Sequence, residues 1–130
     1  FRTLLETNGT LADELDAVID DLDFVAMDIK LPGSTGAGEL WEAHSRFLRT
    51  AARASVFAKV VVTAGTSPEE MRRAADVVAG VGRSIPLVIQ PVSGPACCSG
   101  EELTALQRGA MGKLDDARVI PQCHRILGLQ

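Results

Sequence analysis

The chain has 130 residues, and we expect one domain over residues 1–130. Apolar residues make up 46% of the sequence and aromatic residues only 4%, which suits the packing of small branched side chains in an α/β protein. The formal net charge of −4, without a basic run, excludes the basic surface of a nucleic-acid-binding protein, and no apolar stretch approaches the ~20 residues of a membrane span.

In chain order the sequence predicts nine elements, strand and helix in alternation. They are a strand at Arg2–Glu6, a helix over Leu11–Asp20, a strand at Phe24–Ile29, a helix over Leu40–Ala51, a strand at Phe57–Val62, a helix from Ser67 to Gly80, a strand at Leu87–Gln90, a helix from Ser99 to Leu114 and a strand at Arg118–Ile120. Thr10 can cap the first helix, and a Glu three residues after Ser67 and after Ser99 predicts two capping boxes.

This alternation predicts an α/β fold with a parallel sheet and right-handed crossovers. Five strands and four helices fit two architectures. One is a flavodoxin-like open sheet, which is complete at this length. The other is a part of a (β/α) barrel, because eight β/α units need ~250 residues. Periodicity alone leaves both open.

Three cysteines, Cys97, Cys98 and Cys123, are present. An odd number without regular spacing argues against a disulfide framework and favours a reduced, cytoplasmic setting. We interpret the adjacent Cys97 and Cys98 as incidental rather than as metal ligands. The chain opens with Phe1 inside a strand-like run and has no signal-peptide pattern, so we expect a piece of a longer protein.

Ligands of parallel α/β proteins bind at the C-terminal ends of the strands. Polar side chains stand near all five of these ends: Glu6, Thr7, Asn8, Asp28, Lys30, Lys59, Thr63, Gln90, Gln122 and His124. We therefore predict that they converge on one mouth that binds a small ligand. A free-standing flavodoxin-like domain that holds a small anionic ligand would show the same pattern.

Several of these residues also have a structural interpretation. Asn8-Gly9 is a common tight turn, because both residues tolerate positive φ. Asp28 and Lys30 point to the same face of a strand and can form a plain ion pair. Lys59 can be a surface lysine whose stem lies along apolar side chains.

Two further features are interpreted as structural. His44 lies on an apolar helix face and is assigned to packing, which leaves His124 as the better functional histidine. The glycine-rich segment Gly33–Gly38 lacks the Gly-Lys-Ser/Thr ending of a phosphate loop, so we predict a flexible loop there.

Taken together, the motifs resemble those of the 7-carboxy-7-deazaguanine synthases, a family of radical S-adenosylmethionine (SAM) enzymes. The resemblance rests on Glu6-Thr7-Asn8-Gly9, Asp28-Ile29-Lys30-Leu31-Pro32, Lys59–Thr63, Pro86–Val92 and Arg118–Arg125. The last segment, with its Pro-Gln-Cys-His core, is the most family-specific.

The sequence departs from the family in four ways. Cys123 stands where the family has Thr, and Arg125 where it has Lys. The loop with three cysteines that holds the [4Fe–4S] cluster is missing, as is a glycine-rich motif of the second strand. The resemblance therefore implies the C-terminal part of a radical SAM barrel, inactive without the cluster-binding segment.

The resemblance also implies chemistry and residue roles. The family converts 6-carboxy-5,6,7,8-tetrahydropterin to 7-carboxy-7-deazaguanine with SAM, a [4Fe–4S] cluster and Mg²⁺, as a cytoplasmic homodimeric lyase. By analogy, Glu6, Asn8, Asp28 and Lys30 would bind SAM. The pterin substrate would be bound by Gln90, Gln122, His124 and Arg125.

Overall fold

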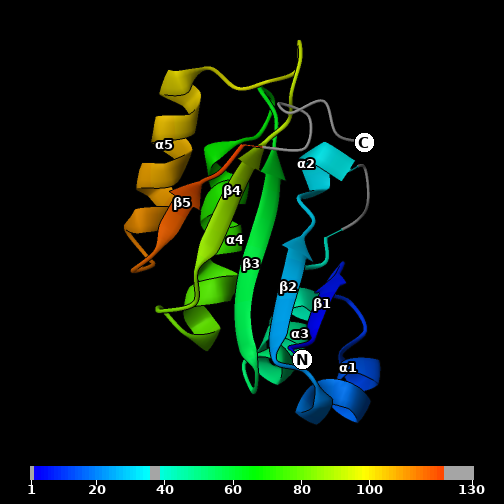
Figure 1. The fold of residues 1–130 in the computed structure, drawn as a ribbon. Helices are drawn as coiled ribbons and strands as arrows, with labels where there is room; N and C mark the ends of the chain where they lie inside the picture. The colour runs from blue at the N-terminus through cyan, green and yellow to red at the C-terminus, as the bar shows by residue number, and fades with distance from the viewer. Residues whose placement is uncertain (1, 36–38, 122–130) are drawn as a thin grey trace.

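The computed structural model describes residues 2–35 and 39–121, and the chain alternates strands with helices as expected (Figure 1). The strands are β1 (Leu4–Thr7), β2 (Phe24–Ile29), β3 (Ser55–Val62), β4 (Leu87–Pro91) and β5 (Ala117–Val119). The helices are α1 (Ala12–Val18) with a 3-10 turn η1 (Ile19–Asp21), α2 (Pro32–Thr35), α3 (Trp41–Ala51), α4 (Pro68–Val81) and α5 (Gly100–Met111). All predicted strands and helices are present with small shifts of their ends.

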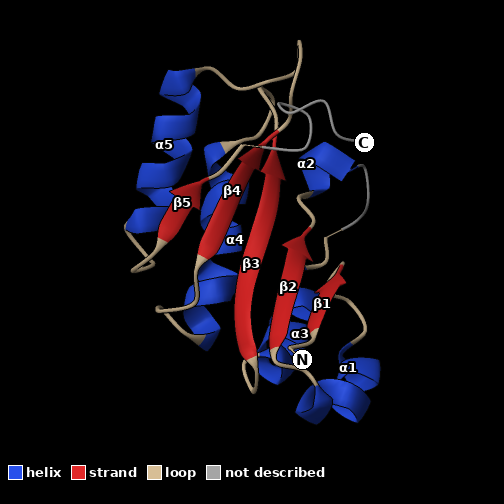
Figure 2. Ribbon diagram, in the orientation of Figure 1, coloured by secondary structure: helices blue, strands red, loops and turns tan. Residues whose placement is uncertain are grey.

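The five strands form one parallel sheet in the order β1-β2-β3-β4-β5 (Figure 2). Neighbouring helices pack on each other in the same sequence, α1 on α3, α3 on α4 and α4 on α5. A flavodoxin-like sheet instead has the strand order 2-1-3-4-5 and helices on both faces. The consecutive order is that of a segment of a (β/α) barrel, and the sheet is open.

The two faces of the sheet differ in what covers them. Side chains alternate between the faces, and one face is packed against the helices. Its central side chains, which are at most 2% exposed, are Val25, Met27, Ile29, Ala58, Val60, Val62, Leu87 and Ile89. On the other face Phe24, Phe57, Val61 and Val88 are only half-buried. We call this second side the open face of the sheet.

The helix caps follow the sequence in part. At α5 the predicted capping box is confirmed, because Ser99 Oγ accepts from Glu102 N and a Glu102 carboxylate oxygen accepts from Ser99 N. At α4 the predicted box is wrong in its second half. Ser67 Oγ accepts from Glu70 N at 3.1 Å, but the Glu70 carboxylate accepts from Gly33 N at 3.3 Å and so joins α4 to α2.

Two local predictions near the strand ends are also corrected. Thr10 does not cap α1, which begins after Leu11; its hydroxyl donates to Asn8 Oδ1 at 2.9 Å. The segment expected as a loop from Gly33 begins inside helix α2, and residues 36–38 lie outside the described residues. No helix within residues 2–35 and 39–121 is long and apolar enough to cross a membrane.

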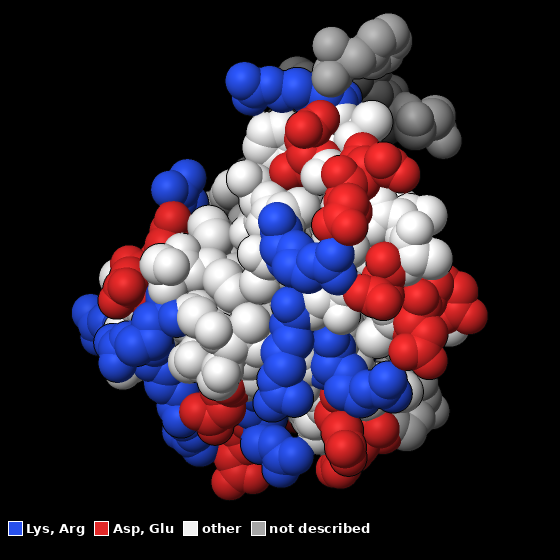
Figure 3. All heavy atoms as spheres, turned by 90° about the horizontal axis from the view of Figure 1, so that it is seen from below, with Lys and Arg blue, Asp and Glu red and all other residues white. Residues whose placement is uncertain are grey.

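Near the N-terminal ends of the strands, ion pairs link neighbouring elements. Arg53, in the turn between α3 and β3, donates to Asp16 at 2.7 Å and to Asp20 at 2.6 Å, which joins that turn to α1 and η1. Figure 3 shows this end from below, with Lys and Arg side chains lying among Asp and Glu. In the described part of the chain, acidic and basic side chains lie side by side at this end, and the ion pairs of Arg53 link elements that are distant in sequence.

Candidate ligand site at the strand ends

The open face carries a group of three charged side chains near the end of β2 and beside the middle of β3. Asp28 and Lys59 are register partners on the two strands. Asp28 Oδ1 lies 3.3 Å from Lys59 Nζ, and Asp28 Oδ2 lies 3.4 Å from Lys30 Nζ. The three side chains are 26–36% exposed, so water reaches the group. Lys59 lies in the middle of β3, because the strand begins two residues earlier than predicted.

A cavity of about 240 Å³ adjoins this group at the C-terminal end of the sheet. Its lining residues are Asp28, Ile29, Lys30, Leu31, Val61, Thr63 and Val92. Three successive strand ends contribute to this cavity, whereas the sequence predicted that all five converge. Of the predicted polar residues that the structure describes, Asp28, Lys30 and Thr63 line the cavity, and Glu6, Thr7, Asn8, Lys59 and Gln90 do not. Thr63 Oγ1 accepts a hydrogen bond from Gly65 N at 3.2 Å, and within the described residues its hydroxyl donates to no acceptor.

The charges of the group do not cancel. Two ammonium groups share one carboxylate, so the site keeps a net charge of about +1. Each ammonium has three donors, and the carboxylate takes one contact from each lysine. The arrangement can bind an anion such as a carboxylate.

The turn after β1 approaches this site from the neighbouring strand. Gly9 has a φ of +70°, so the turn interpretation of Asn8-Gly9 holds. A Cβ on Gly9 would lie 2.7 Å from Met27 Cγ and 3.1 Å from His44 Nδ1, so the turn packs directly on β2 and α3. Asn8 is exposed and held by Thr10, and Glu6 is exposed on the open face.

His44 connects the strand ends in a way that the packing interpretation missed. It is fully buried, and its ring lies between the Gly9 turn and the end of β2. Nδ1 lies 2.8 Å from the Gly9 carbonyl oxygen, and Nε2 accepts from Lys30 N at 3.1 Å. Burial lowers the pKa of His44; the hydrogen bond to Gly9 opposes this, and the charge of Lys30 adds to it. The one signal in the sequence is a polar side chain inside the apolar stripe of α3.

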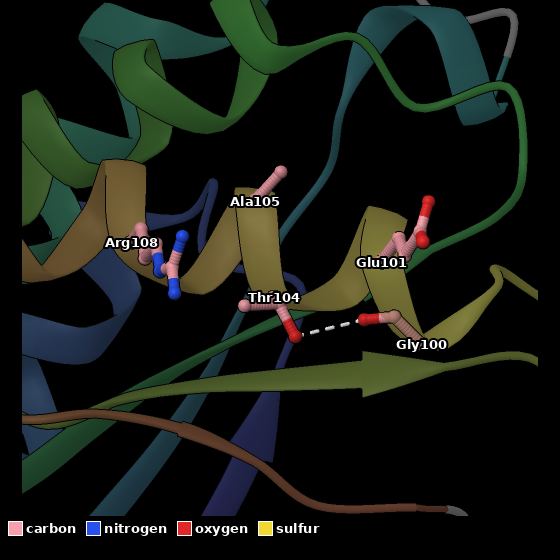
Figure 4. Close-up of a pocket in the computed structure, with 5 residues that line it drawn as sticks. All are labelled: Gly100, Glu101, Thr104, Ala105 and Arg108. Carbon is pink, nitrogen blue, oxygen red and sulfur yellow. Dashed lines mark hydrogen bonds between the residues drawn. The ribbon is translucent and has the colours of Figure 1, made fainter.

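A second hollow, of about 300 Å³, lies along α5 (Figure 4). All of its lining residues come from that one helix, namely Gly100, Glu101, Thr104, Ala105 and Arg108. The Thr104 hydroxyl donates to the Gly100 carbonyl oxygen at 2.8 Å, so its proton is already used. A groove with one wall lacks the convergence of polar groups from several elements that marks a binding site.

Curated relatives of this chain carry one name, 7-carboxy-7-deazaguanine synthase. The protein of Geobacter sulfurreducens is 40% identical over 127 residues, which cover 95% of this chain and 51% of the relative. The protein of Methanopyrus kandleri is 32% identical over 130 residues, 98% of this chain and 48% of the relative. The protein of Methanothermobacter thermautotrophicus is 30% identical over 149 aligned positions, which cover 99% of this chain and 60% of the relative.

The chain is similar along nearly its whole length to proteins named 7-carboxy-7-deazaguanine synthase. The resemblance inferred from the motifs is therefore confirmed. The chain spans about half the length of the curated relatives it matches, which fits a C-terminal portion. No family model and no solved structure matches it.

The described part of the chain offers no site for the iron–sulfur cluster that the resemblance implies. Cys97 and Cys98 are adjacent in the loop before α5, where Cys98 is buried and Cys97 Sγ donates to the Cys98 carbonyl oxygen at 3.4 Å. Burial raises the pKa of Cys98, which disfavours the thiolate that a cluster needs. Residues 2–35 and 39–121 hold no group of three His, Cys, Asp or Glu side chains placed to bind a metal.

The residues expected to bind SAM and substrate in such a synthase are only partly described. Asp28 and Lys30 lie together at the cavity, with Glu6 and Asn8 on the neighbouring strand end. Gln90 is the register partner of Val61 and half-buried on the open face. The other three predicted substrate residues, Gln122, His124 and Arg125, lie outside the described residues, as does Cys123.

Proposed function

We propose that this chain forms the C-terminal, ligand-binding part of a radical SAM lyase that makes 7-carboxy-7-deazaguanine from 6-carboxy-5,6,7,8-tetrahydropterin in 7-deazapurine biosynthesis. Similarity to the named synthases along nearly the whole chain supports this proposal. So does the consecutive parallel sheet, because the ends of its strands bring polar groups to one edge.

The observation that carries the proposal is the uncompensated positive charge of Lys30 and Lys59 around Asp28. SAM has an amino-acid carboxylate, and the pterin substrate has a carboxylate on its ring. A site of net charge +1 beside a 240 Å³ cavity suits such a group. We assign Lys30 to the SAM carboxylate, and Asp28 to holding the ammonium group of Lys30 in place.

The other roles are those that the resemblance implies. Glu6 and Asn8 would bind the SAM ribose or its amino-acid part from the end of β1. Gln90, with Gln122 and His124, has donors and acceptors suited to the edge of a pterin, and Arg125 adds positive charge. When bound, SAM supplies the radical chemistry that takes hydrogen from the substrate. This chain's own residues bind and orient the two ligands.

Two cofactors of the family do not fit the described residues. The cluster needs thiolates that are not grouped there, so we propose that its ligands come from outside this part of the protein. Mg²⁺ prefers carboxylates, but Asp28 is already shared by two ammonium groups that would repel a cation. We further propose that the protein is cytoplasmic, because unpaired cysteines suit a reduced compartment. As the resemblance implies, we propose that it is a homodimer, and that it acts on no nucleic acid or membrane.

Turnover of the pterin by the synthase that contains this chain tests the proposal. Lys30→Ala and His124→Ala are expected to abolish formation of 7-carboxy-7-deazaguanine while the protein stays folded. Lys113→Ala is the matched control, because Lys113 is 33% exposed and pairs with a single carboxylate, Asp76, away from the strand ends. Wild-type rates in both site variants would show that the site is misplaced.

A further inference from the structure

We infer that His44 is a positioning residue for the ligand site, which holds the backbone of Lys30 through Nε2 and the Gly9 turn through Nδ1. This inference rests on the proposed function, because it assigns to His44 the orientation of the lysine that binds the SAM carboxylate. It concerns a residue that contacts neither ligand and acts through Lys30.

The two hydrogen bonds determine the chemical state of the ring. A carbonyl oxygen only accepts, so the nitrogen facing Gly9 O, Nδ1, carries the proton. An amide N–H only donates, so the nitrogen facing Lys30 N, Nε2, must be unprotonated. The neutral Nδ1–H tautomer alone satisfies both partners. An imidazolium would present a second N–H to the Lys30 amide and break that contact.

The position of His44 explains why this link matters for the site. It comes from the first turn of α3, and it reaches two strand-end loops that belong to β1 and β2. Lys30 follows the last residue of β2, where the sheet no longer holds the backbone through strand pairing. The imidazole supplies an acceptor to the Lys30 amide at that point. The aim of the Lys30 side chain toward Asp28 and the cavity therefore depends on His44.

Substitutions can separate the two links. In His44→Asn the amide nitrogen takes the place of Nδ1 and can donate to Gly9 O, whereas Lys30 N loses its acceptor. In His44→Gln the amide oxygen takes the place of Nε2 and can accept from Lys30 N. Leu48→Ala is the matched control, because Leu48 is fully buried on the same helix, ~6 Å further from the strand ends.

The probes are S-adenosylhomocysteine, which has the amino-acid carboxylate, and 5′-methylthioadenosine, which lacks it. Their dissociation constants are measured by calorimetry on the synthase that contains this chain. We expect His44→Asn to raise the dissociation constant of S-adenosylhomocysteine about tenfold and that of 5′-methylthioadenosine less than about twofold. Only S-adenosylhomocysteine has the carboxylate that binds Lys30. His44→Gln should restore most of the lost affinity, and Leu48→Ala should leave the ratio of the two constants unchanged.

The outcomes separate this inference from the proposed function. If Lys30→Met loses the preference for S-adenosylhomocysteine while His44→Asn keeps it, the inference is wrong and the proposed function stands. Equal losses of affinity for S-adenosylhomocysteine in His44→Asn and His44→Gln also overturn the inference, since the hydrogen bond of Nε2 would then not be what positions Lys30. A wild-type protein without that preference overturns both. Nitrogen NMR of the histidines gives an independent readout: we expect the Nδ1–H tautomer for His44, and the Nε2–H tautomer would contradict the inference.

Discussion

Replacing His44 with Asn should change the pH dependence of stability in a way that no neighbouring packing residue can. In the folded chain, burial lowers the pKa of His44 below the value of about 6.5 that the unfolded chain has. Between pH 6.5 and the lowered value, the unfolded state takes up a proton that the folded state does not. The free energy of unfolding therefore falls as the pH falls, by up to about 1.4 kcal/mol per pH unit.

The magnitude at neutral pH comes from the hydrogen bonds. His44→Asn leaves the partly buried Lys30 amide without its acceptor, which costs about 1–2 kcal/mol near pH 7.5. Asn does not titrate, so this variant lacks the loss of stability that wild-type His44 causes at lower pH. The difference between wild type and variant should therefore shrink as the pH falls from 6.5 to 5.5, by at most about 1 kcal/mol.

Urea unfolding of the chain at pH 7.5, 6.5 and 5.5, at one fixed protein concentration, measures this difference. The chain has two histidines, so His124→Asn is the matched control, because it removes the other histidine and leaves His44 in place. Aspartate and glutamate side chains ordinarily titrate near pH 4 and contribute little in this range. The same pH dependence in wild type and His44→Asn would refute the burial of a neutral imidazole at this position.

Three further predictions follow from the same structure. Gly9→Ala should lower the free energy of unfolding by about 2–4 kcal/mol, because Gly9 has positive φ and an added Cβ would meet Met27. Gly80→Ala is the control and should be neutral or stabilising, because a Cβ there meets no atom within 4 Å. Equal effects of the two substitutions in urea unfolding would contradict this prediction. The chain of residues 1–130 alone, treated with iron and sulfide without oxygen, should form no 5′-deoxyadenosine from SAM, and turnover would sink the proposed dependence on cluster ligands from elsewhere. Light scattering over a concentration series should show self-association through the open face, where Phe57 and Val61 are half-buried; a strictly monomeric chain would argue against it.

The sequence by itself determined the local elements and the kind of site. Apolar runs such as Phe24–Ile29 predicted β2 to the residue, and Ser99 with Glu102 predicted the cap of α5, because both signals act over a few neighbouring residues. The polar residues at the end of β2 predicted where a ligand could bind, since parallel strands end at one edge. Asp28 and Lys30 lie there as expected.

Only the tertiary structure decided how these elements meet. The consecutive strand order, which rejects the flavodoxin-like alternative, depends on pairing between strands about 20–30 residues apart, and local periodicity does not encode it. Local periodicity also does not encode the register that places Lys59 beside Asp28. Nor does it encode the hydrogen bond from Gly33 N to the Glu70 carboxylate, which takes the place of the second half of the capping box. His44 shows the reason most directly. From the sequence it is one polar residue in an apolar stripe, and its two partners are 35 and 14 residues away, so only the packing of α3 under the strand ends brings them to its ring.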